Sequence, residues 1–210
     1  EVSALRGVEQ PPQFHPEGDV WTHTMIMLEG MRTPSLRLAW GVLLHDIGKP
    51  DTFMRADRIR FHGHAERGVE LADAICRRLR FSNADTEGVK ALVANHMRFA
   101  HVREMRRSKL RAFVERRDFD DHLELHRLDC VSSHGLLDNH AFAAERRDQF
   151  QREEPFVPLV TGKDLIAAGY EPGPAFGKVL AEARDLQHEG ELADREQALS
   201  FASERLHDLS

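Results

Sequence analysis

The sequence has little of what stabilises small secreted folds and nothing that looks like a membrane span. Its two cysteines, Cys76 and Cys130, form no C-x-x-C pair, which excludes a disulfide framework and a thiolate zinc cage. No apolar run approaches the roughly 18 residues of a membrane helix, and no signal-peptide pattern opens the chain. We therefore expect a cytoplasmic protein that does not enter a membrane.

Positive charge is not in excess either. The net charge is −6 with histidine neutral, whereas a dedicated nucleic-acid binder is expected to be strongly basic. The charge is uneven, because residues 98–117 hold eight Arg or Lys against two Glu, and residues 181–210 hold eight acidic residues against three Arg. The basic stretch is either a solvated helix face or a surface that follows a phosphate backbone.

The length of 210 residues favours one domain with an appendage. Residues 1–18 are rich in turn signals and are predicted to be a linker. Residues 19–152 carry helical periodicity and are predicted to form the main domain. The stretch 155–158, which begins and ends with proline, separates them from a small helical tail, so that the tail is assigned to residues 153–210.

Capping residues and periodicity predict an all-α fold. Asp19 is expected to cap a helix that runs to about Gly30, and Thr33 with Pro34 is expected to start the next. Residues 50–61 are mixed and partly β-like, which favours a loop or a small hairpin. Further helices are predicted over residues 64–80, 85–98, 108–116, 119–132, 137–152, 162–169, 174–187 and 194–207.

Histidine is the unusual component of this composition. There are 13 histidines, and 11 of them lie between His15 and His140. His23, His45 and His96 each follow apolar residues at helical spacing, which turns them toward a bundle interior. Each of these histidines alone is better explained as an ordinary core or surface residue than as a ligand.

The adjacent pair His45 and Asp46 favours a ligand site over that simpler explanation. Two neighbouring ligands at the end of a helix, followed by Gly48 and Lys49, offer an anchor for a cation and a positive charge for a phosphate. Asp129 lies on the inner face of a later helix, where an unpaired carboxylate is costly unless a cation meets it. Imidazoles and carboxylates from several helices are the usual components of a metal site in a bundle.

These residues resemble the H…HD…D signature of the HD-domain metal-dependent phosphohydrolases. The strings HPEGDVWTHT at residues 15–24, HDIGKP at 45–50 and GHAERG at 63–68 are similar to the HD region of bacterial tRNA CCA-adding nucleotidyltransferases and related poly(A) polymerase-like proteins. Residues 161–177 are similar to the C-terminal segment that follows that region. The resemblance covers roughly residues 11–200, and it implies an HD-domain helical bundle with a small helical C-terminal extension.

The resemblance also implies a ligand set and a cofactor. One or two divalent ions are expected, from Mn, Fe, Co, Ni or Zn with Mg as a further candidate, because mixed imidazole and carboxylate ligation suits transition metals. Asp46 and Lys49 are the expected catalytic residues, and Lys49, Arg67 and Arg98 are expected to bind substrate. The expected metal ligands are His23, His45, Asp46, His64, His96 and Asp129.

Two functions are compatible with this pattern. The first is a phosphodiesterase or phosphatase that hydrolyses 2′,3′-cyclic nucleotides or related phosphoesters through a metal-bound hydroxide. The alternative is a non-catalytic arm of a CCA-adding enzyme, which would hold tRNA with the basic stretch. The chain has no Gly-Ser motif with paired aspartates, so as given it is not expected to add nucleotides. The substrate, the oligomeric state and a head domain before Glu1 are left open by the sequence.

Overall fold

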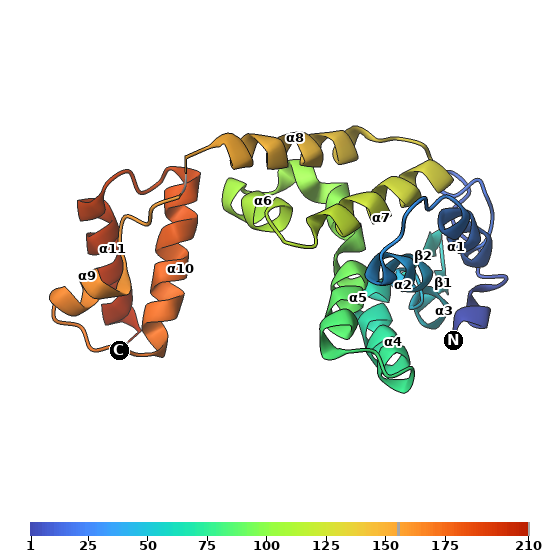
Figure 1. Cartoon of the computed structure of the whole chain (residues 1–210), viewed down its shortest axis with the longest axis horizontal. Coiled ribbons are helices and arrows are strands. Elements are labelled where there is room, and N and C mark those ends of the chain that lie inside the picture. The colour runs from blue at the N-terminus through green and yellow to red at the C-terminus, as the bar shows by residue number, and fades with distance from the viewer. Residues whose placement is uncertain (155, 210) are drawn as a thin grey trace. The chain divides into compact units, whose positions relative to one another are not determined.

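The computed structural model describes residues 1–154 and 156–209, which form two compact units (Figure 1). The first unit comprises Glu1–Arg103 with Arg116–Glu145, and the second comprises Glu104–Glu115 with Arg146–Ser210. Helices dominate both units, and the sheet structure of the described residues is one two-stranded hairpin. The all-α prediction is therefore confirmed.

The first unit is built mainly from helices α1, α2, α4, α5 and α7. Helix α4 packs along α5, and α2 packs against α1, α5 and α7. The elements are η1 (Val2–Leu5), α1 (Val20–Glu29), α2 (Leu36–Leu44), α3 (Lys49–Thr52), β1 (Met54–Arg55), β2 (Ile59–Arg60), α4 (His64–Arg78), α5 (Asn83–Asn95), η2 (His96–Glu104) and α7 (Phe119–Ser132).

Side-chain caps fix where these helices begin. The Asp19 carboxylate accepts a hydrogen bond from the Thr22 amide at 2.8 Å and so starts α1 as predicted. The predicted start of α2 is wrong by two residues. Ser35, not Thr33, is the N-cap, because its hydroxyl accepts from the Leu38 amide at 3.0 Å, and Pro34 lies outside the helix.

The segment after α2 differs in part from the expectation of a loop or hairpin. The hairpin is present, with Met54 paired to Arg60 and Arg55 to Ile59, but Lys49–Thr52 forms a helical turn before it. Helix α5 ends earlier than predicted, at Asn95, and the chain continues as the 3₁₀ segment η2. The first residue of η2 is His96, so this histidine lies at the change of helix type.

The core of the first unit includes part of the N-terminal segment. Leu5 is fully buried against Leu44 and Ile47, in a cluster that also contains residues of α4 and α5. The segment is tied to the start of α1, since the Val20 amide donates to the Val8 carbonyl at 3.0 Å. Residues that the turn signals assign to a linker thus pack in the core, where burial of a leucine contributes about 2 kcal/mol.

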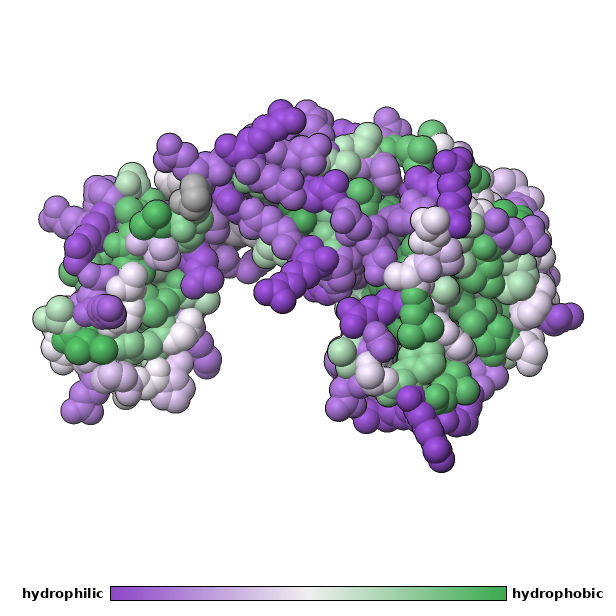
Figure 2. Space-filling view, in the orientation of Figure 1, coloured by the Kyte–Doolittle hydropathy of each residue, from purple (hydrophilic) through white to green (hydrophobic). Residues whose placement is uncertain are grey.

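The second unit is a small helical cluster. Helix α10 packs against α6 and α11, and α9 packs against α11. Val160, Leu165, Val179 and Leu206 lie at its centre. The elements are α6 (Arg107–Val114), α9 (Gly162–Ala167), α10 (Pro174–Glu189) and α11 (Arg195–Asp208), with α8 (Asp138–Arg152) beginning in the first unit and ending in the second. Figure 2 shows that the surface along α8 is largely hydrophilic.

Candidate metal centre

A close approach between two backbones places the end of α2 beside the start of α4. A Cβ atom on Gly48 would lie 2.2 Å from the His64 carbonyl oxygen and 2.7 Å from the Gly68 nitrogen. Only glycine fits at this position without displacing α4. This contact brings Asp46, two residues earlier, next to His64.

The first group of site residues consists of Asp46, His64 and His96, which come from three segments. Asp46 Oδ1 lies 3.6 Å from His64 Nε2 and 3.7 Å from His96 Nε2. The two Nε2 atoms are 3.0 Å apart. The side chains of Asp46 and His96 are almost completely buried, and that of His64 is 11% exposed.

The second group consists of His23, His45 and Asp129, and it adjoins the first through the neighbouring residues His45 and Asp46. Asp129 Oδ1 lies 3.2 Å from His23 Nε2, and Asp46 Oδ2 lies 3.2 Å from His45 Nε2. Within each group the nearest ligand atoms all lie within 4.8 Å of one another. The six residues predicted as metal ligands are therefore brought together at one place in the first unit.

The hydrogen bonds of the four imidazoles point their Nε2 atoms inward. The Nδ1 atoms of His45, His64 and His96 lie 2.6–2.8 Å from the carbonyl oxygens of Val42, Phe61 and Val93. A carbonyl can only accept, so each Nδ1 carries the proton and each neutral ring keeps a lone pair on Nε2. His23 Nε2 and His45 Nε2 are both buried, and each lies 3.2 Å from a carboxylate oxygen, of Asp129 and of Asp46 respectively.

This donor set fits a divalent metal ion. Four imidazole nitrogens and two carboxylates face one another in a buried site. Burying so many acceptor atoms together is unfavourable unless they share a cation. The ligands are nitrogen and oxygen, without thiolate, as predicted from the cysteine count. Sequence and geometry thus agree on which residues could hold the ion, and neither selects the metal.

Burial and hydrogen bonds shift the pKa values of the site residues. Burial opposes the charged form of His23, but hydrogen bonds to Asp129 and Glu17 outweigh it and raise the pKa of His23 to about 9. Burial lowers the pKa of His96 to about 4 and also lowers that of His64, so both rings are neutral near pH 7. Burial opposes the charged form of Asp46, but its contacts with Lys49 and the neighbouring histidines outweigh burial and hold its pKa well below the ordinary value.

Lys49, predicted as a catalytic and phosphate-binding residue, lies against Asp46. Its Nζ donates to Asp46 Oδ2 at 2.7 Å and to Gln10 Oε1 at 2.7 Å, and it lies 5.1 Å from the centre of the Phe61 ring. The side chain is 9% exposed and lines a cleft beside the histidines. Gln10 was not predicted from the sequence, because a lone glutamine in a turn-rich segment carries no signal.

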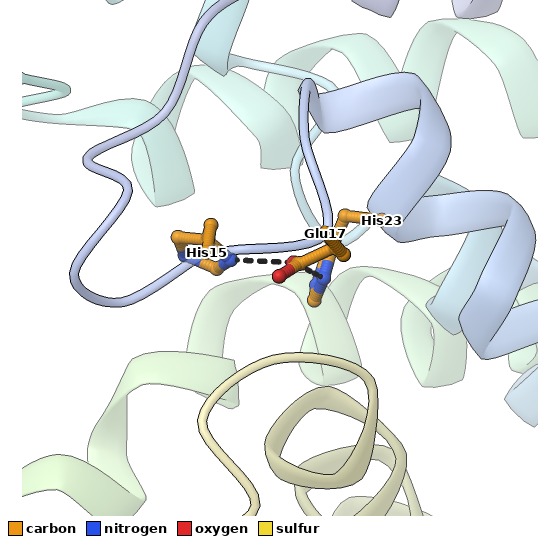
Figure 3. A group of neighbouring side chains, drawn as sticks. All are labelled: His15, Glu17 and His23. Atoms are coloured by element: carbon orange, nitrogen blue, oxygen red, sulfur yellow. Dashed lines mark hydrogen bonds and ion pairs between the residues drawn. The ribbon is translucent and has the colours of Figure 1, made fainter.

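Two further residues of the site, His15 and Glu17, also come from the N-terminal segment (Figure 3). Glu17 Oε1 lies 2.6 Å from His23 Nδ1 and 2.9 Å from His15 Nδ1. From the sequence, both residues were noted only within the string at residues 15–24, and no role was predicted for either. Their spacing of six and eight residues from His23 was the signal that could have found them.

The cleft beside the metal centre has a volume of about 930 Å³ and lies wholly in the first unit. Asp46, His64, His96 and Asp129 line its charged part. Its rim is apolar, where Phe14, Met97 and Leu136 are 56%, 49% and 64% exposed. The cleft can therefore accept a ligand that carries both a charged and an apolar group.

The two arginines predicted to bind substrate do not line this cleft. Arg67 is on the outer side of α4, where it donates to Asp51 and Glu70 at 2.7 Å each. Arg98 donates to Asn95 at 3.2 Å, and burial lowers its pKa. Both arginines were weaker candidates than Lys49 in the sequence, and neither is among the residues that line the cleft.

The basic stretch 98–117 does not form one continuous surface element. It runs through η2, α6 and the turn before α7, and it contributes to both units. Several of its side chains are paired with acidic groups, including Lys109 with Asp185, Arg111 with Glu153 and Arg116 with Asp118.

The helical fold and the site define the class of this chain. Residues 19–125 match the HD domain, and the chain belongs to the HD domain family. This match runs from α1 to the middle of α7, and it covers the predicted ligands from His23 to His96 but not Asp129. Domains of this family bind divalent metal ions, in agreement with the clustered His and Asp residues.

Known proteins similar over nearly the whole chain are tRNA nucleotidyltransferases. An A-adding tRNA nucleotidyltransferase of Deinococcus radiodurans is 35% identical over 87% of this chain and 46% of its own length. A CC-adding tRNA nucleotidyltransferase of Thermus thermophilus is 32% identical over 96% of this chain and 48% of its own length. A multifunctional CCA protein of Alkalilimnicola ehrlichii is 31% identical over 87% of this chain. The chain thus spans about half the length of the relatives it matches.

The search for membrane segments found no candidate. Among the described residues, no helix is both long and apolar enough to cross a bilayer.

Proposed function

We propose that this chain is a metal-dependent phosphohydrolase, and specifically a phosphodiesterase that acts on 2′,3′-cyclic nucleotides or related phosphoesters. The observation that carries the proposal is the inward convergence of four imidazole Nε2 atoms and two carboxylates at the end of a cleft. Such an arrangement is costly to bury unless it binds a cation. Membership of the HD family supports the same conclusion.

The residues of the site have separate roles in this proposal. His23, His45, Asp46, His64, His96 and Asp129 hold one or two divalent ions, and Asp46, between the two groups, is the residue that could serve both. Bound ions supply Lewis acidity, which activates water for attack on phosphorus and neutralises charge on the phosphoryl oxygens. His64 and His96, neutral near pH 7, are suited to that ligation without first losing a proton, whereas His23, with a pKa of about 9, releases one when it binds the ion.

Lys49 binds the phosphate in this scheme. An ammonium group has three N–H donors, and Asp46 and Gln10 use two of them. The remaining donor is available to a phosphoryl oxygen in the cleft, which Lys49 lines. Asp46 and Gln10 also fix the direction of the long side chain, so that little rotamer entropy is lost when the substrate binds.

The rim of the cleft supports a nucleotide as the substrate. Exposed Phe14 and Met97 offer apolar and aromatic surface, on which a base can stack, beside a charged end that attracts phosphate. Stacking of a base on an aromatic ring is worth about 1–3 kcal/mol. A small phosphoester without a base gains nothing from this rim, which favours a nucleotide over a small base-free phosphoester as the substrate.

Metal analysis and hydrolysis of 2′,3′-cyclic AMP test the proposal. The purified chain, loaded with Mn²⁺ or Co²⁺ and desalted, is expected to retain the ion and to open the cyclic phosphate. Asp46→Asn should lose the ion and reduce kcat/KM by at least about 100-fold, the upper end of the effect of outer residues at metal sites. Asp51→Asn is the matched control, because Asp51 is five residues away in an exposed ion pair with Arg67. Retention of full activity in Asp46→Asn, or absence of metal from the wild-type chain, would exclude this function.

A second function, tRNA binding, is favoured by the names of the relatives. They are tRNA nucleotidyltransferases, and Arg106 and Arg117 of the basic stretch are exposed. We propose that the chain also contacts tRNA through this stretch. Fluorescence anisotropy with tRNA at several salt concentrations should give affinity that falls with salt and that Arg117→Glu weakens. No binding at low salt would exclude it and would leave the hydrolase proposal intact.

A further inference from the structure

Glu17 is a buried carboxylate with two histidine partners. Its side chain is 8% exposed, in the segment that precedes α1. One oxygen, Oε1, contacts Nδ1 of both His23 and His15 (Figure 3). Asp19 holds this segment in place at the start of α1. One of its carboxylate oxygens accepts a hydrogen bond from the Gly7 amide at 2.6 Å, and the other caps α1.

The short distances identify hydrogen bonds between Glu17 and the two rings. The distances are 2.6 Å to His23 and 2.9 Å to His15. The carboxylate can only accept, so both Nδ1 atoms carry the proton.

The hydrogen bond to Glu17 sets the tautomer of His23. His23 differs from the other three histidines in the group that accepts its Nδ1–H. His45, His64 and His96 donate their Nδ1–H to backbone carbonyls three residues earlier, so local helix geometry orients them. His23 lies in the first turn of α1 and donates to a side chain instead. Its Nε2 then faces Asp129 at 3.2 Å.

We propose that Glu17 is a positioning residue of the metal centre, which holds His23 so that Nε2 binds the ion, and that His15 clamps Glu17 in this position from the cleft side. The proposal rests on the function proposed above. His15 lines the cleft and is 17% exposed on its side chain, with its ring edge-on to that of His23 at 4.9 Å between centres. A carboxylate behind a metal-binding histidine is typically worth 10- to 100-fold in metal affinity.

The first test is the tautomer of His23 in the metal-free protein. Long-range ¹⁵N–¹H NMR spectra of ¹⁵N-histidine-labelled chain, recorded in EDTA above the pKa of His23 of about 9 and assigned with His23→Gln, should show the Nδ1–H form of the neutral His23 ring. Glu17→Ala should shift that signal toward the Nε2–H form, and Glu66→Ala should not. Glu66 is the matched control, because it is an exposed carboxylate that lines the same cleft.

The second test is metal affinity by titration with Mn²⁺. Glu17→Ala should bind Mn²⁺ 10- to 100-fold more weakly than the wild type, and Glu17→Gln, which keeps an acceptor oxygen, should lie between them. His15→Ala should weaken binding less than Glu17→Ala. His15→Asn should restore it, because the asparagine amide nitrogen can occupy the place of Nδ1 and donate to Glu17.

The outcomes separate this inference from the proposed function. Wild-type affinity in Glu17→Ala, or an unchanged His23 tautomer, would overturn the role of Glu17. Equal affinities of His15→Ala and His15→Asn would overturn the clamp. If the wild-type chain binds no metal, the proposed function fails, while the NMR experiment still reports on Glu17 and His23. If Glu17→Ala does not fold, Glu17→Gln and the His15 pair provide the same comparison.

Discussion

His64 and His96 face each other through their Nε2 atoms at 3.0 Å, while both donate Nδ1–H to backbone carbonyls. Because burial lowers both pKa values, neither ring carries a second proton near pH 7, and two lone pairs point at each other. A bound cation removes this repulsion between the two lone pairs, and in the metal-free protein the repulsion persists. The site is therefore arranged for binding and not for the stability of the metal-free fold.

Replacement of His96 by leucine should separate these two properties. In EDTA, His96→Leu should be no less stable than the wild type, because an apolar side chain replaces a buried lone pair without a partner. With Mn²⁺ the wild type should gain about 3–4 kcal/mol at a concentration 100 to 1,000 times its Kd, and the variant much less. Thermal unfolding with and without the ion measures both. A variant strongly destabilised in EDTA would contradict this account.

Gly48 should not tolerate a methyl group. In Gly48→Ala the added Cβ would lie 2.2 Å from the His64 carbonyl oxygen, so α4 must move and Asp46 must separate from His64. We expect a loss of about 1–3 kcal/mol in the free energy of unfolding, together with loss of bound metal. Gly177→Ala in α10 is the control, since open space surrounds that position and the change should stabilise the helix by about 1 kcal/mol.

The metal-free fold should lose stability in mild acid through His122. Burial lowers the pKa of His122 from 6.5 to about 4, with the Asp118 carboxylate 3.4 Å away opposing the shift. Below pH 6.5 the unfolded chain binds a proton at His122, whereas the folded chain does not bind it until about pH 4. The free energy of unfolding therefore falls across that pH window. The contribution is at most about 3 kcal/mol. Urea unfolding in EDTA at pH 7, 5.5 and 4.5 should show a smaller fall for His122→Asn than for the wild type.

Arg67→Ala should leave catalysis unchanged. The side chain is 41% exposed and paired with Asp51 and Glu70 outside the cleft. Exposed ion pairs contribute about 0–1 kcal/mol, so stability should change little. The measurement is kcat/KM on 2′,3′-cyclic AMP for Arg67→Ala and for Lys49→Ala. Lys49→Ala should show a large loss of kcat/KM and Arg67→Ala should not. A selective rise in KM for Arg67→Ala would place this arginine at the substrate after all.

The clustering of the candidate ligands could be predicted because local sequence determines the orientation of their side chains. Adjacent His45 and Asp46 at a helix end and periodic apolar neighbours around His96 and Asp129 are visible without a structure. His15, Glu17 and Gln10 could not be predicted in the same way, because their segment lacks periodicity and its packing depends on contacts such as Val8 with Val20. Long arginines such as Arg67 were equally unpredictable, since the nearest carboxylate decides where a flexible side chain points.

The distribution of the ligands along the chain has a consequence for biosynthesis. His23 belongs to α1, near the start, and Asp129 to α7, near the end of the first unit. During translation the ion cannot be fully enclosed until α7 has left the ribosome, although most of the imidazoles have emerged well before. An ion held by both His23 and Asp129 could therefore be fully coordinated only late in the synthesis of the chain.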